Sequence, residues 1–221
     1  MHSTKLIRPS YIDGSVKAPP SKSMTIRALI AASLAKGTST IQNPAKCDDT
    51  KAALKIIEAL GAKAKEKGDK IIIEGGGKPS ESVLYCMESG LCMRIAPALA
   101  ALHDRKFMIT GSGSLSYRPI DMVVEPLKMA GAQCEIDKNS TKIHVEGPLK
   151  GGDITVDGSM TSQVVTGLLM TLPLVDKNST ITVKNPTSIP YIAMTIALLK
   201  KYGIKITHDD TYENFNIKGK Q

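Results

Sequence analysis

Hydrophobic and polar positions follow two periods along this chain, and the same succession of periods occurs three times. Three stretches are apolar at most positions and long enough for buried helices: residues 21–37, 89–103 and 159–175. Three later stretches repeat apolar residues at helical spacing and run into a glycine: residues 48–61, 118–131 and 189–203. Because glycine commonly follows the last turn of a helix, we expect each of these helices to end there.

Short runs rich in β-branched residues separate and follow these helices. One run comes after each apolar helix, at residues 38–42, 106–110 and 179–183. A further run closes each unit, at residues 70–75, 142–147 and 214–219, and its final glycines are 72 residues apart both times. Each unit therefore predicts the order β-α-β-α-β-β.

Agreement of several landmarks over three copies indicates an internal repeat. We expect an α/β fold in which residues 13–221 form one domain of three repeats, 13–78, 79–150 and 151–221, with pseudo-threefold symmetry around buried helices. Residues 1–12 precede the first repeat and predict a lone strand. Because a short strand without partners is not stable, this strand is expected to belong to another domain.

Composition narrows the class of protein. No apolar run reaches the roughly 18 residues of a membrane span, and the first residues lack the apolar segment of a secretory signal, so we expect a soluble, cytoplasmic chain without a membrane partner. The four cysteines form no CxxC pair and have no histidine at metal-ligand spacing. We therefore expect no metal and no cofactor.

The chain is basic, with a formal net charge of +8. This charge fits an anionic partner, which is either a nucleic acid or a phosphorylated small molecule, and it is equally consistent with a solvated basic surface. The lysines are dispersed, only eight aromatic residues (six Tyr and two Phe) are available for base stacking, and no nucleic-acid motif is present. Nucleic acid is therefore not expected as the partner.

Hydroxyl-bearing residues and glycines open the first helix of each repeat. The three openings are Ser21-Lys22-Ser23, Ser89-Gly90-Leu91 and Ser159-Met160-Thr161. Such residues leave backbone N–H groups free, and the helix dipole favours an anion there, although for Ser89 or Ser159 alone simple capping is the favoured interpretation. If the repeats are symmetric, three such starts meet at one end of the domain and form an anion-binding floor.

Two cations stand out at the first of these openings. Lys22 and Arg27 lie five residues apart, at the start of a helix that is otherwise apolar. A phosphate or carboxylate would satisfy both cations, each charge-assisted bond contributing about 1.5–3 kcal/mol. We therefore interpret them as ligand-binding residues.

At this opening the chain resembles a known family. The run Ser21-Lys22-Ser23-Met24-Thr25-Ile26-Arg27 is similar to the Ser-Lys-Ser-x-Ser-x-Arg signature of the 5-enolpyruvylshikimate-3-phosphate synthases (3-phosphoshikimate 1-carboxyvinyltransferases). Four further segments agree, at residues 47–50, 117–120, 158–163 and 188–192, so the resemblance spans nearly the whole chain. In that family six repeats form two domains of an inside-out α/β barrel, and the active site lies between them. The resemblance implies that this chain is the N-terminal half.

The family resemblance also implies which residues contact the substrates, shikimate 3-phosphate and phosphoenolpyruvate. The implied substrate-binding residues are Lys22, Ser23, Arg27, Gly90, Arg94, Arg118, Thr161, Ser162, Gln163, Ser188 and Tyr191. Lys22 is the implied catalytic residue and contacts both substrates. The acid–base groups and remaining arginines are implied to lie in a C-terminal domain of the same enzyme, so residues 1–221 alone are expected to be inactive.

Within the implied site, the binding roles divide between two regions. Ser23 and Arg27 bind the carboxylate and ring hydroxyls of shikimate 3-phosphate. A second group holds its phosphate and ring: Thr161, Ser162, Ser188, Gln163 and Tyr191. Arg118 binds phosphoenolpyruvate, with Gly90 and Arg94 on the same wall, and Asp49 is a supporting residue.

One loop departs from the family pattern. Where the family has Gly-Asn-Ala-Gly-Thr, this chain has Met87-Glu88-Ser89-Gly90-Leu91. A carboxylate at Glu88 is unfavourable beside an anion site unless it points away, and Leu91 replaces a hydroxyl. Two alternative functions stay open: a stand-alone binding module for a phosphorylated metabolite, and half of the sister enzyme that acts on UDP-N-acetylglucosamine.

Overall fold

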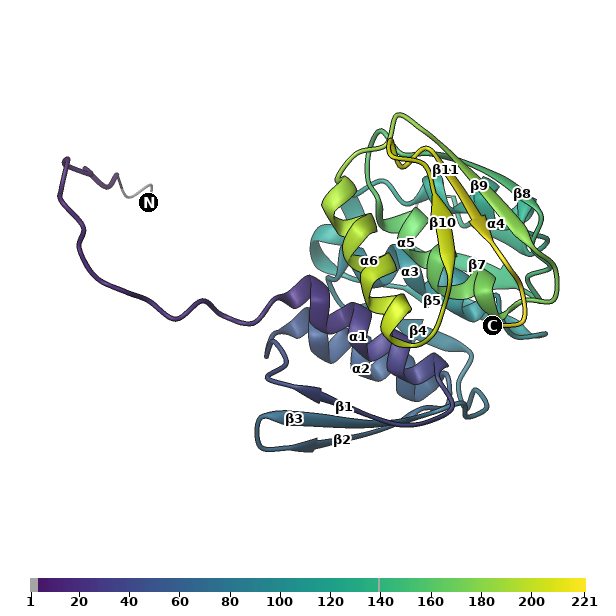
Figure 1. Cartoon of the computed structure of the whole chain (residues 1–221), viewed down its shortest axis with the longest axis horizontal. Coiled ribbons are helices and arrows are strands. Elements are labelled where there is room, and N and C mark those ends of the chain that lie inside the picture. Colours follow the sequence, from purple (N-terminus) through teal and green to yellow (C-terminus); the bar gives the residue numbers. More distant parts are fainter. Residues whose placement is uncertain (1–3, 139) are drawn as a thin grey trace.

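The computed structural model describes residues 4–138 and 140–221, and it is built of short helices enclosed by three small sheets (Figure 1). The α-helices are α1 Lys22–Leu34, α2 Asp48–Ala59, α3 Gly90–Ala100, α4 Val124–Met129, α5 Gln163–Thr171 and α6 Ile189–Lys201. Three 3-10 helices lie between them: η1 Gly113–Tyr117, η2 Asp121–Val123 and η3 Leu172–Leu174.

The strands form three separate sheets, one for each repeat. The first sheet contains β1 Gly37–Gln42, β2 Lys63–Lys67 and β3 Lys70–Gly75. The second contains β4 Val83–Tyr85, β5 Lys106–Thr110, β6 Gln133–Ile136 and β7 Ile143–Glu146. The third contains β8 Asp153–Asp157, β9 Ser179–Lys184, β10 Ile206–His208 and β11 Asn214–Ile217.

The sheet topology confirms the three-repeat α/β fold. The second sheet has the order β4-β5-β7-β6 and the third has β8-β9-β11-β10, with the first pair parallel and the others antiparallel in both. The first sheet has the same order without a leading strand, β1-β3-β2. The predicted β-α-β-α-β-β unit is therefore complete in repeats two and three, while the prediction of a leading strand in repeat one is wrong for this structure.

That difference follows from the course of the N-terminal segment. Residues 4–20 form neither helix nor strand, and they extend away from the body to the start of α1 (Figure 1). Their apolar side chains are 81–97% exposed: Leu6, Ile7, Tyr11, Ile12 and Val16. The predicted strand within residues 1–12 is thus unpaired here, and residues 1–3 lie outside the described part. Its assignment to another domain stays a prediction.

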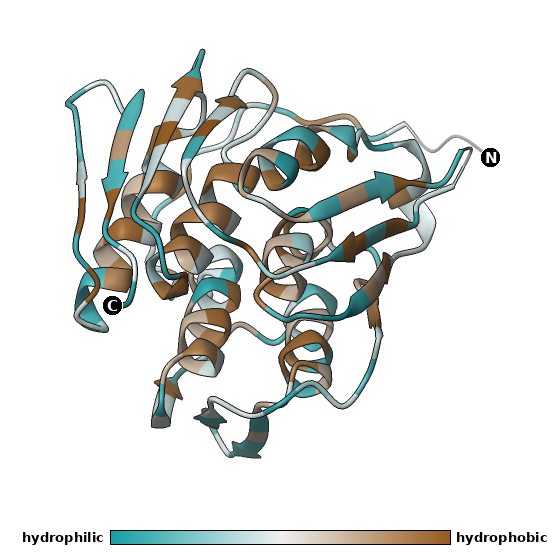
Figure 2. Cartoon of the chain, turned by 90° about the vertical axis from the view of Figure 1, so that its right-hand side faces the viewer, coloured by the Kyte–Doolittle hydropathy of each residue, from teal (hydrophilic) through white to brown (hydrophobic). Residues whose placement is uncertain are grey.

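The core lies between the sheets and the helices. Strands bury alternate residues, as in β9, so each sheet turns its apolar face inward toward the helices. Hydrophobic and hydrophilic bands alternate along the strands accordingly (Figure 2). The helices α3 and α5 are buried at nearly every position and pack against each other, while α1 packs against α2 and α6. The first helices of the three repeats, α1, α3 and α5, were expected to lie side by side. This prediction is confirmed for α3 and α5, which pack against each other.

Helix starts differ from the sequence-based expectation in one repeat. The helices of repeats one and two begin one residue after Ser21 and Ser89, whose hydroxyls accept the N–H groups of Met24 and Cys92. In repeat three the helix begins only at Gln163, so the stretch from residue 159 forms a loop. Among the described helices, none combines the length and apolar character that crossing a membrane requires.

Candidate functional site

Side-chain contacts join the N-terminal parts of four helices, α1, α2, α3 and α5, at one end of the domain. They connect Lys22 of α1 with Asp49 of α2, Asp49 with Ser89 at the start of α3, and Arg94 of α3 with Gln163 of α5. Helix starts distant in the sequence therefore lie side by side. The structure thus brings together the predicted residues of all three repeats, and with them the positive ends of the helix dipoles.

Lys22 forms an ion pair with Asp49, which also accepts a hydrogen bond from the buried hydroxyl of Ser89. Its Nζ lies 3.2 Å from Oδ1 of Asp49, and the Ser89 hydroxyl donates to the same oxygen at 2.9 Å. The side chain of Lys22 is about half exposed and that of Asp49 is 28% exposed. Asp49 therefore orients Lys22 while leaving its ammonium accessible to a ligand.

Arg27 is a buried cation. Its guanidinium contacts two hydroxyls, a backbone carbonyl and an aromatic ring. Its Nε donates to Thr195 Oγ1 at 2.9 Å, Nη2 to Thr166 Oγ1 at 3.2 Å, and Nη1 to its own helix at 3.1 Å. The residue is 1% exposed, and its guanidinium lies 5.5 Å from the ring centre of Tyr191. Burial lowers the pKa of Arg27 to about 10, which shows how unfavourable this environment is for an uncompensated charge.

Arg94 and Arg118 converge above Gly90. A Cβ at Gly90 would lie 2.9 Å from Nη1 of Arg118 and 3.1 Å from Nη1 of Arg94, so a larger residue there would push the two guanidiniums from these positions. Arg94 also donates to Gln163 Oε1 at 2.8 Å and to the carbonyl of Pro119 at 2.9 Å, while its buried Nε has no partner among the described atoms. Burial and the charge of Arg118 lower the pKa of Arg94.

The third repeat contributes a polar loop and the start of α6. Thr161 Oγ1 accepts the N–H of Gln163 at 3.2 Å, and Ser162 is buried without a side-chain cap bond. Ser188 is exposed in a left-handed backbone conformation (φ 53°) directly before α6, and Tyr191 is 43% exposed. Thr161 therefore presents its hydroxyl beside Gln163, and Ser188 precedes the turn that carries Tyr191, whose ring faces Arg27.

The two departures from the family pattern have structural explanations. The Glu88 carboxylate accepts the backbone N–H of Ser114 at 3.0 Å, so it is engaged at the start of η1. Leu91 is only 7% exposed and belongs to the core. The carboxylate therefore has its own donor, and Leu91 packs inward in place of lining an anion site.

Sequence reasoning missed the buried threonines that hold Arg27. Thr166 and Thr195 are fully buried, and their hydroxyls lie 3.4 Å apart on α5 and α6. The available signal was a threonine flanked on both sides by apolar residues: Thr166 within residues 164–170 and Thr195 within residues 192–199. A buried hydroxyl requires a hydrogen-bond partner, and a cation from another repeat supplies one.

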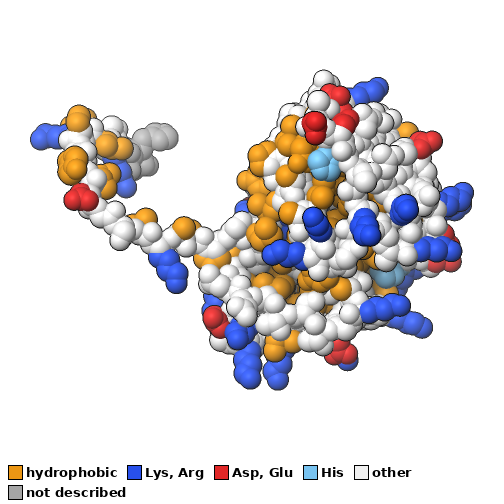
Figure 3. All heavy atoms as spheres, in the orientation of Figure 1, with side chains coloured by type: hydrophobic (Ala, Val, Ile, Leu, Met, Phe, Trp, Pro, Cys, Tyr) orange, Lys and Arg blue, Asp and Glu red, His pale blue; other side chains and the backbone are white. Residues whose placement is uncertain are grey.

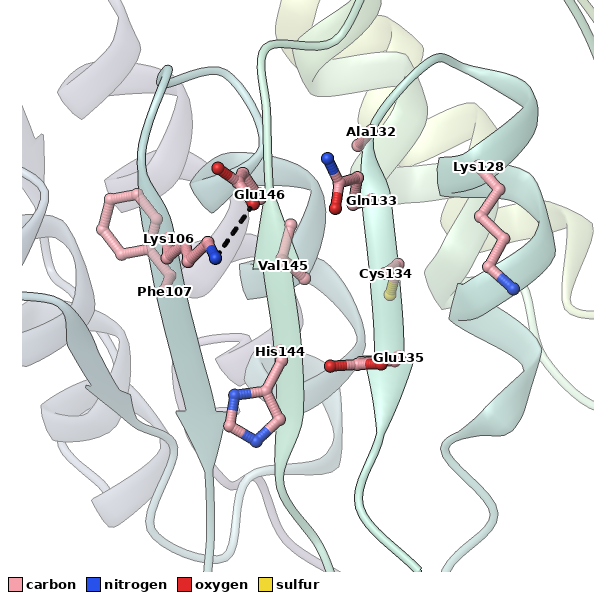
Figure 4. Close-up of a pocket in the computed structure, with 10 residues that line it drawn as sticks. All are labelled: Lys106, Phe107, Lys128, Ala132, Gln133, Cys134, Glu135, His144, Val145 and Glu146. Atoms are coloured by element: carbon pink, nitrogen blue, oxygen red, sulfur yellow. Dashed lines mark ion pairs between the residues drawn. The ribbon is translucent and has the colours of Figure 1, made fainter.

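An open hollow of about 590 Å³ lies elsewhere, on the second sheet (Figure 4). Residues of β5, β6, β7 and α4 line it, and its charges are partly paired, as in the 3.6 Å contact of Lys106 with Glu146. None of the predicted site residues lies there. The hollow is therefore separate from the helix starts that carry the candidate site.

Comparison with known proteins decides the family. The family model described as EPSP synthase (3-phosphoshikimate 1-carboxyvinyltransferase) matches residues 7–221. The chain belongs to this family. Proteins named 3-phosphoshikimate 1-carboxyvinyltransferase from Methanocorpusculum labreanum and Clostridium perfringens are 38% and 37% identical to it, over 94% and 98% of the chain.

Solved structures agree at the level of the fold. EPSP synthase from Acinetobacter baumannii superposes with a TM-score of 0.81 at 24% identity, covering 94% of this chain and 47% of that one. An enolpyruvyl transferase from Streptomyces tendae gives 0.72 at 17% identity, covering 94% and 49%. The chain also spans only 50% and 52% of the two curated relatives. It therefore corresponds to about half of an EPSP synthase.

Proposed function

We propose that this chain is the shikimate 3-phosphate-binding half of an EPSP synthase, which transfers the enolpyruvyl group of phosphoenolpyruvate to the 5-hydroxyl of shikimate 3-phosphate. One observation carries the proposal: Arg94 and Arg118 converge at Gly90, Arg27 is buried against α5 and α6, and none of the three pairs with a carboxylate among the described residues. Cations left without counter-ions favour an anionic ligand.

Family membership supports a division of this site into two regions. Ser23 and Arg27 bind the carboxylate and ring hydroxyls of shikimate 3-phosphate. Its phosphate and ring contact the third repeat: Thr161, Ser162, Ser188, Gln163 and Tyr191. Because Arg27 is 1% exposed here, its direct contact with the ligand requires Tyr191 or Ser23 to move.

Phosphoenolpyruvate occupies the second region, against Arg118, Arg94 and Gly90. Lys22 lies between both regions and contacts both substrates. In the reaction the 5-hydroxyl loses its proton as its oxygen bonds to C2 of phosphoenolpyruvate, and C3 takes up a proton. C3 then gives up a proton as the C2–O bond to phosphate breaks, so phosphate leaves and the C2=C3 double bond re-forms. Lys22 and Arg118 stabilise the charge on the transferring group.

The partner is the C-terminal domain of the same enzyme. Apolar surface is visible on the side of the body where residues 4–20 depart (Figure 3), and Met24, Tyr117, Met160 and Tyr191 are 38–91% exposed. Met24 and Tyr117 lie within two residues of Lys22 and Arg118 along the chain, and the ring of Tyr191 faces Arg27. A second domain closing over this side would cover them and complete the phosphoenolpyruvate site.

A reconstitution assay tests this proposal. Residues 1–221 alone should release no phosphate from phosphoenolpyruvate in the presence of shikimate 3-phosphate, because one wall supplies neither all the proton transfers nor the opposing cations. Adding a separately produced C-terminal half should restore turnover. In that mixture Lys22→Ala and Arg118→Ala should each lower kcat/KM at least about tenfold, roughly 1.4 kcal/mol, and Lys65→Ala on an outer strand should not.

Full turnover by residues 1–221 alone, or full activity after Lys22→Ala, would contradict the proposal. The stand-alone binding module predicts tight binding with no response to a second half. The UDP-N-acetylglucosamine alternative predicts turnover of that nucleotide sugar in the same mixture, and the names of the curated relatives give it no support.

A further inference from the structure

Two neighbouring residues before α3 contact opposite sides of the candidate site. Ser89 donates its hydroxyl to Asp49, which pairs with Lys22. Glu88 accepts the N–H of Ser114, at the start of the segment that ends in Arg118. One dipeptide is therefore connected with two cations that belong to different repeats.

The first contact, the hydrogen bond from Ser89 to Asp49, we call the Ser89 arm. A second hydrogen bond holds the Ser89 hydroxyl in place. Ser89 is 1% exposed, and its hydroxyl oxygen also accepts the N–H of Cys92 at 3.3 Å as the cap of α3. A hydroxyl can donate and accept at once, so Ser89 binds its own helix and Asp49 simultaneously. Asp49 lies in the first turn of α2 and is thereby fixed between α3 and Lys22.

The second contact, which we call the Glu88 arm, depends on a glycine. The Glu88 carboxylate occupies the space that a side chain at position 113 would fill. Gly113 has a φ of +58°, and a Cβ there would lie 2.3 Å from the carboxyl carbon of Glu88. A second bond, from Ser112 N–H to the carbonyl of Met87 at 2.8 Å, joins the same two loops. Glu88 thus anchors the beginning of η1, and Arg118 directly follows its end.

The bond to Ser114 also has an electrostatic consequence. Glu88 lies two residues before Gly90, where the guanidiniums of Arg94 and Arg118 converge, so a carboxylate that turned toward them would compete with an anionic ligand. Within the described residues the Glu88 carboxylate forms no salt bridge. Its engagement with a backbone donor therefore leaves both guanidiniums for an external anion.

We propose that Glu88 and Ser89 are a pair of positioning residues: Ser89 sets Lys22 through Asp49, and Glu88 sets Arg118 through Ser114. Together they fix the two sides of the phosphoenolpyruvate site. The identity of this ligand rests on the proposed function, whereas the two arms are features of the chain itself.

Double-mutant cycles test each arm. Phosphoenolpyruvate is titrated into residues 1–221 in the presence of shikimate 3-phosphate and followed by NMR. Glu88→Ala and Ser89→Ala should each weaken its binding about three- to tenfold. The effect of Glu88→Ala should disappear in an Arg118→Ala background and persist in Lys22→Ala, and Ser89→Ala should show the reverse. Glu81→Ala and Ser10→Ala, both on exposed residues outside these loops, are the matched controls and should have no effect.

Conservative variants separate positioning from general stability. Glu88→Gln keeps the acceptor oxygen and should bind within about twofold of wild type, while Gly113→Ala displaces the carboxylate and should resemble Glu88→Ala. The proposal would be overturned if the effects of Glu88→Ala and Ser89→Ala persisted in both the Lys22→Ala and the Arg118→Ala backgrounds. It would also be overturned if Glu88→Gln bound phosphoenolpyruvate as weakly as Glu88→Ala does.

A readout without ligand keeps the two claims distinguishable. Amide hydrogen exchange at Ser114 should accelerate in Glu88→Ala and Gly113→Ala but not in Glu81→Ala. If wild type binds neither substrate, the proposed function fails, and this exchange measurement still decides whether Glu88 holds the loop. Unchanged exchange at Ser114 would reject the Glu88 arm.

Discussion

At the scale of single residues, Arg27 shows how the site opposes stability. Its guanidinium is buried, and Thr166, Thr195 and the Ser23 carbonyl replace the water it lost without supplying a negative charge. Replacing buried ionic groups by apolar side chains of similar volume is often neutral or stabilising. Retention of an arginine here is therefore better explained by ligand binding than by folding.

Arg27→Met should accordingly separate stability from binding. We expect a free energy of unfolding equal to or above that of wild type, because the two threonine hydroxyls can still bond each other and the carbonyl of Tyr191. Affinity for shikimate 3-phosphate should fall at least about tenfold, roughly 1.4 kcal/mol. Urea unfolding and calorimetry check both halves. Loss of stability with undiminished binding would show that Arg27 is structural.

His103 gives a prediction about pH. Burial and the nearby charge of Arg105 lower its pKa below 6.5 in the folded state, so the unfolded chain binds a proton more readily. The folded protein should therefore lose stability as pH falls through 6.5 toward the lower folded pKa. Urea unfolding between pH 7.5 and about 5 should show a shallower decline for His103→Gln than for wild type. Equal slopes would show that other groups set the pH dependence.

At the scale of elements, α5 packs closely against α3 at Gly167. A Cβ at this position would lie 3.4 Å from the Cβ of Ala98 and 3.5 Å from the Cα of Ile95, which are ordinary contacts for one methyl group. This close packing places the first turns of α3 and α5 together, where Arg94 meets Gln163. The helix pair therefore supports the geometry of the site.

Two substitutions at Gly167 should have opposite effects. Gly167→Ala should stabilise the fold by up to about 1 kcal/mol, because glycine inside a helix costs about that much relative to alanine. Gly167→Leu should destabilise it by about 1–3 kcal/mol through overpacking against α3. Urea unfolding of the two variants measures this difference. A leucine tolerated as well as alanine would mean that the helices are not closely packed here.

Most elements could be predicted because local patterns determine them. The glycines that close 48–61 and 189–203 end α2 and α6 within two residues of prediction, and the strand at 106–110 was predicted with the observed ends. The helix expected over 118–131 is instead η2 followed by a short α4, since Pro119 and Pro126 interrupt the ladder of backbone bonds. Local pattern alone could not resolve that break.

The site could be predicted as a set of residues but not as a network. The repeat placed helix starts together, and the motif named Lys22, Arg27 and Arg118. Contacts between repeats, such as Arg27 with Thr166 and Arg94 with Gln163, depend on tertiary packing that spacing along the chain does not encode. Likewise, the extended conformation of residues 4–20 could not be predicted from their own sequence, because pairing as a strand depends on the presence of partner strands.

At the scale of the whole molecule, the domain presents one wall of a site. Its cations line the helix starts, its exposed apolar residues adjoin them, and the chain spans about half the length of its curated relatives. An open wall can orient a substrate but cannot exclude water from it. Binding by this wall alone should therefore be weak, specific and dependent on charge.

A calorimetric titration of residues 1–221 with shikimate 3-phosphate at two salt concentrations tests this account most directly. We predict a dissociation constant on the order of 0.1–1 mM, or about 4–5.5 kcal/mol, with weaker binding at higher salt and after Lys22→Ala. Phosphoenolpyruvate alone should bind less tightly. Sub-micromolar affinity would show a complete receptor, and binding unaffected by salt and by Lys22→Ala would contradict a site built on cations at helix starts.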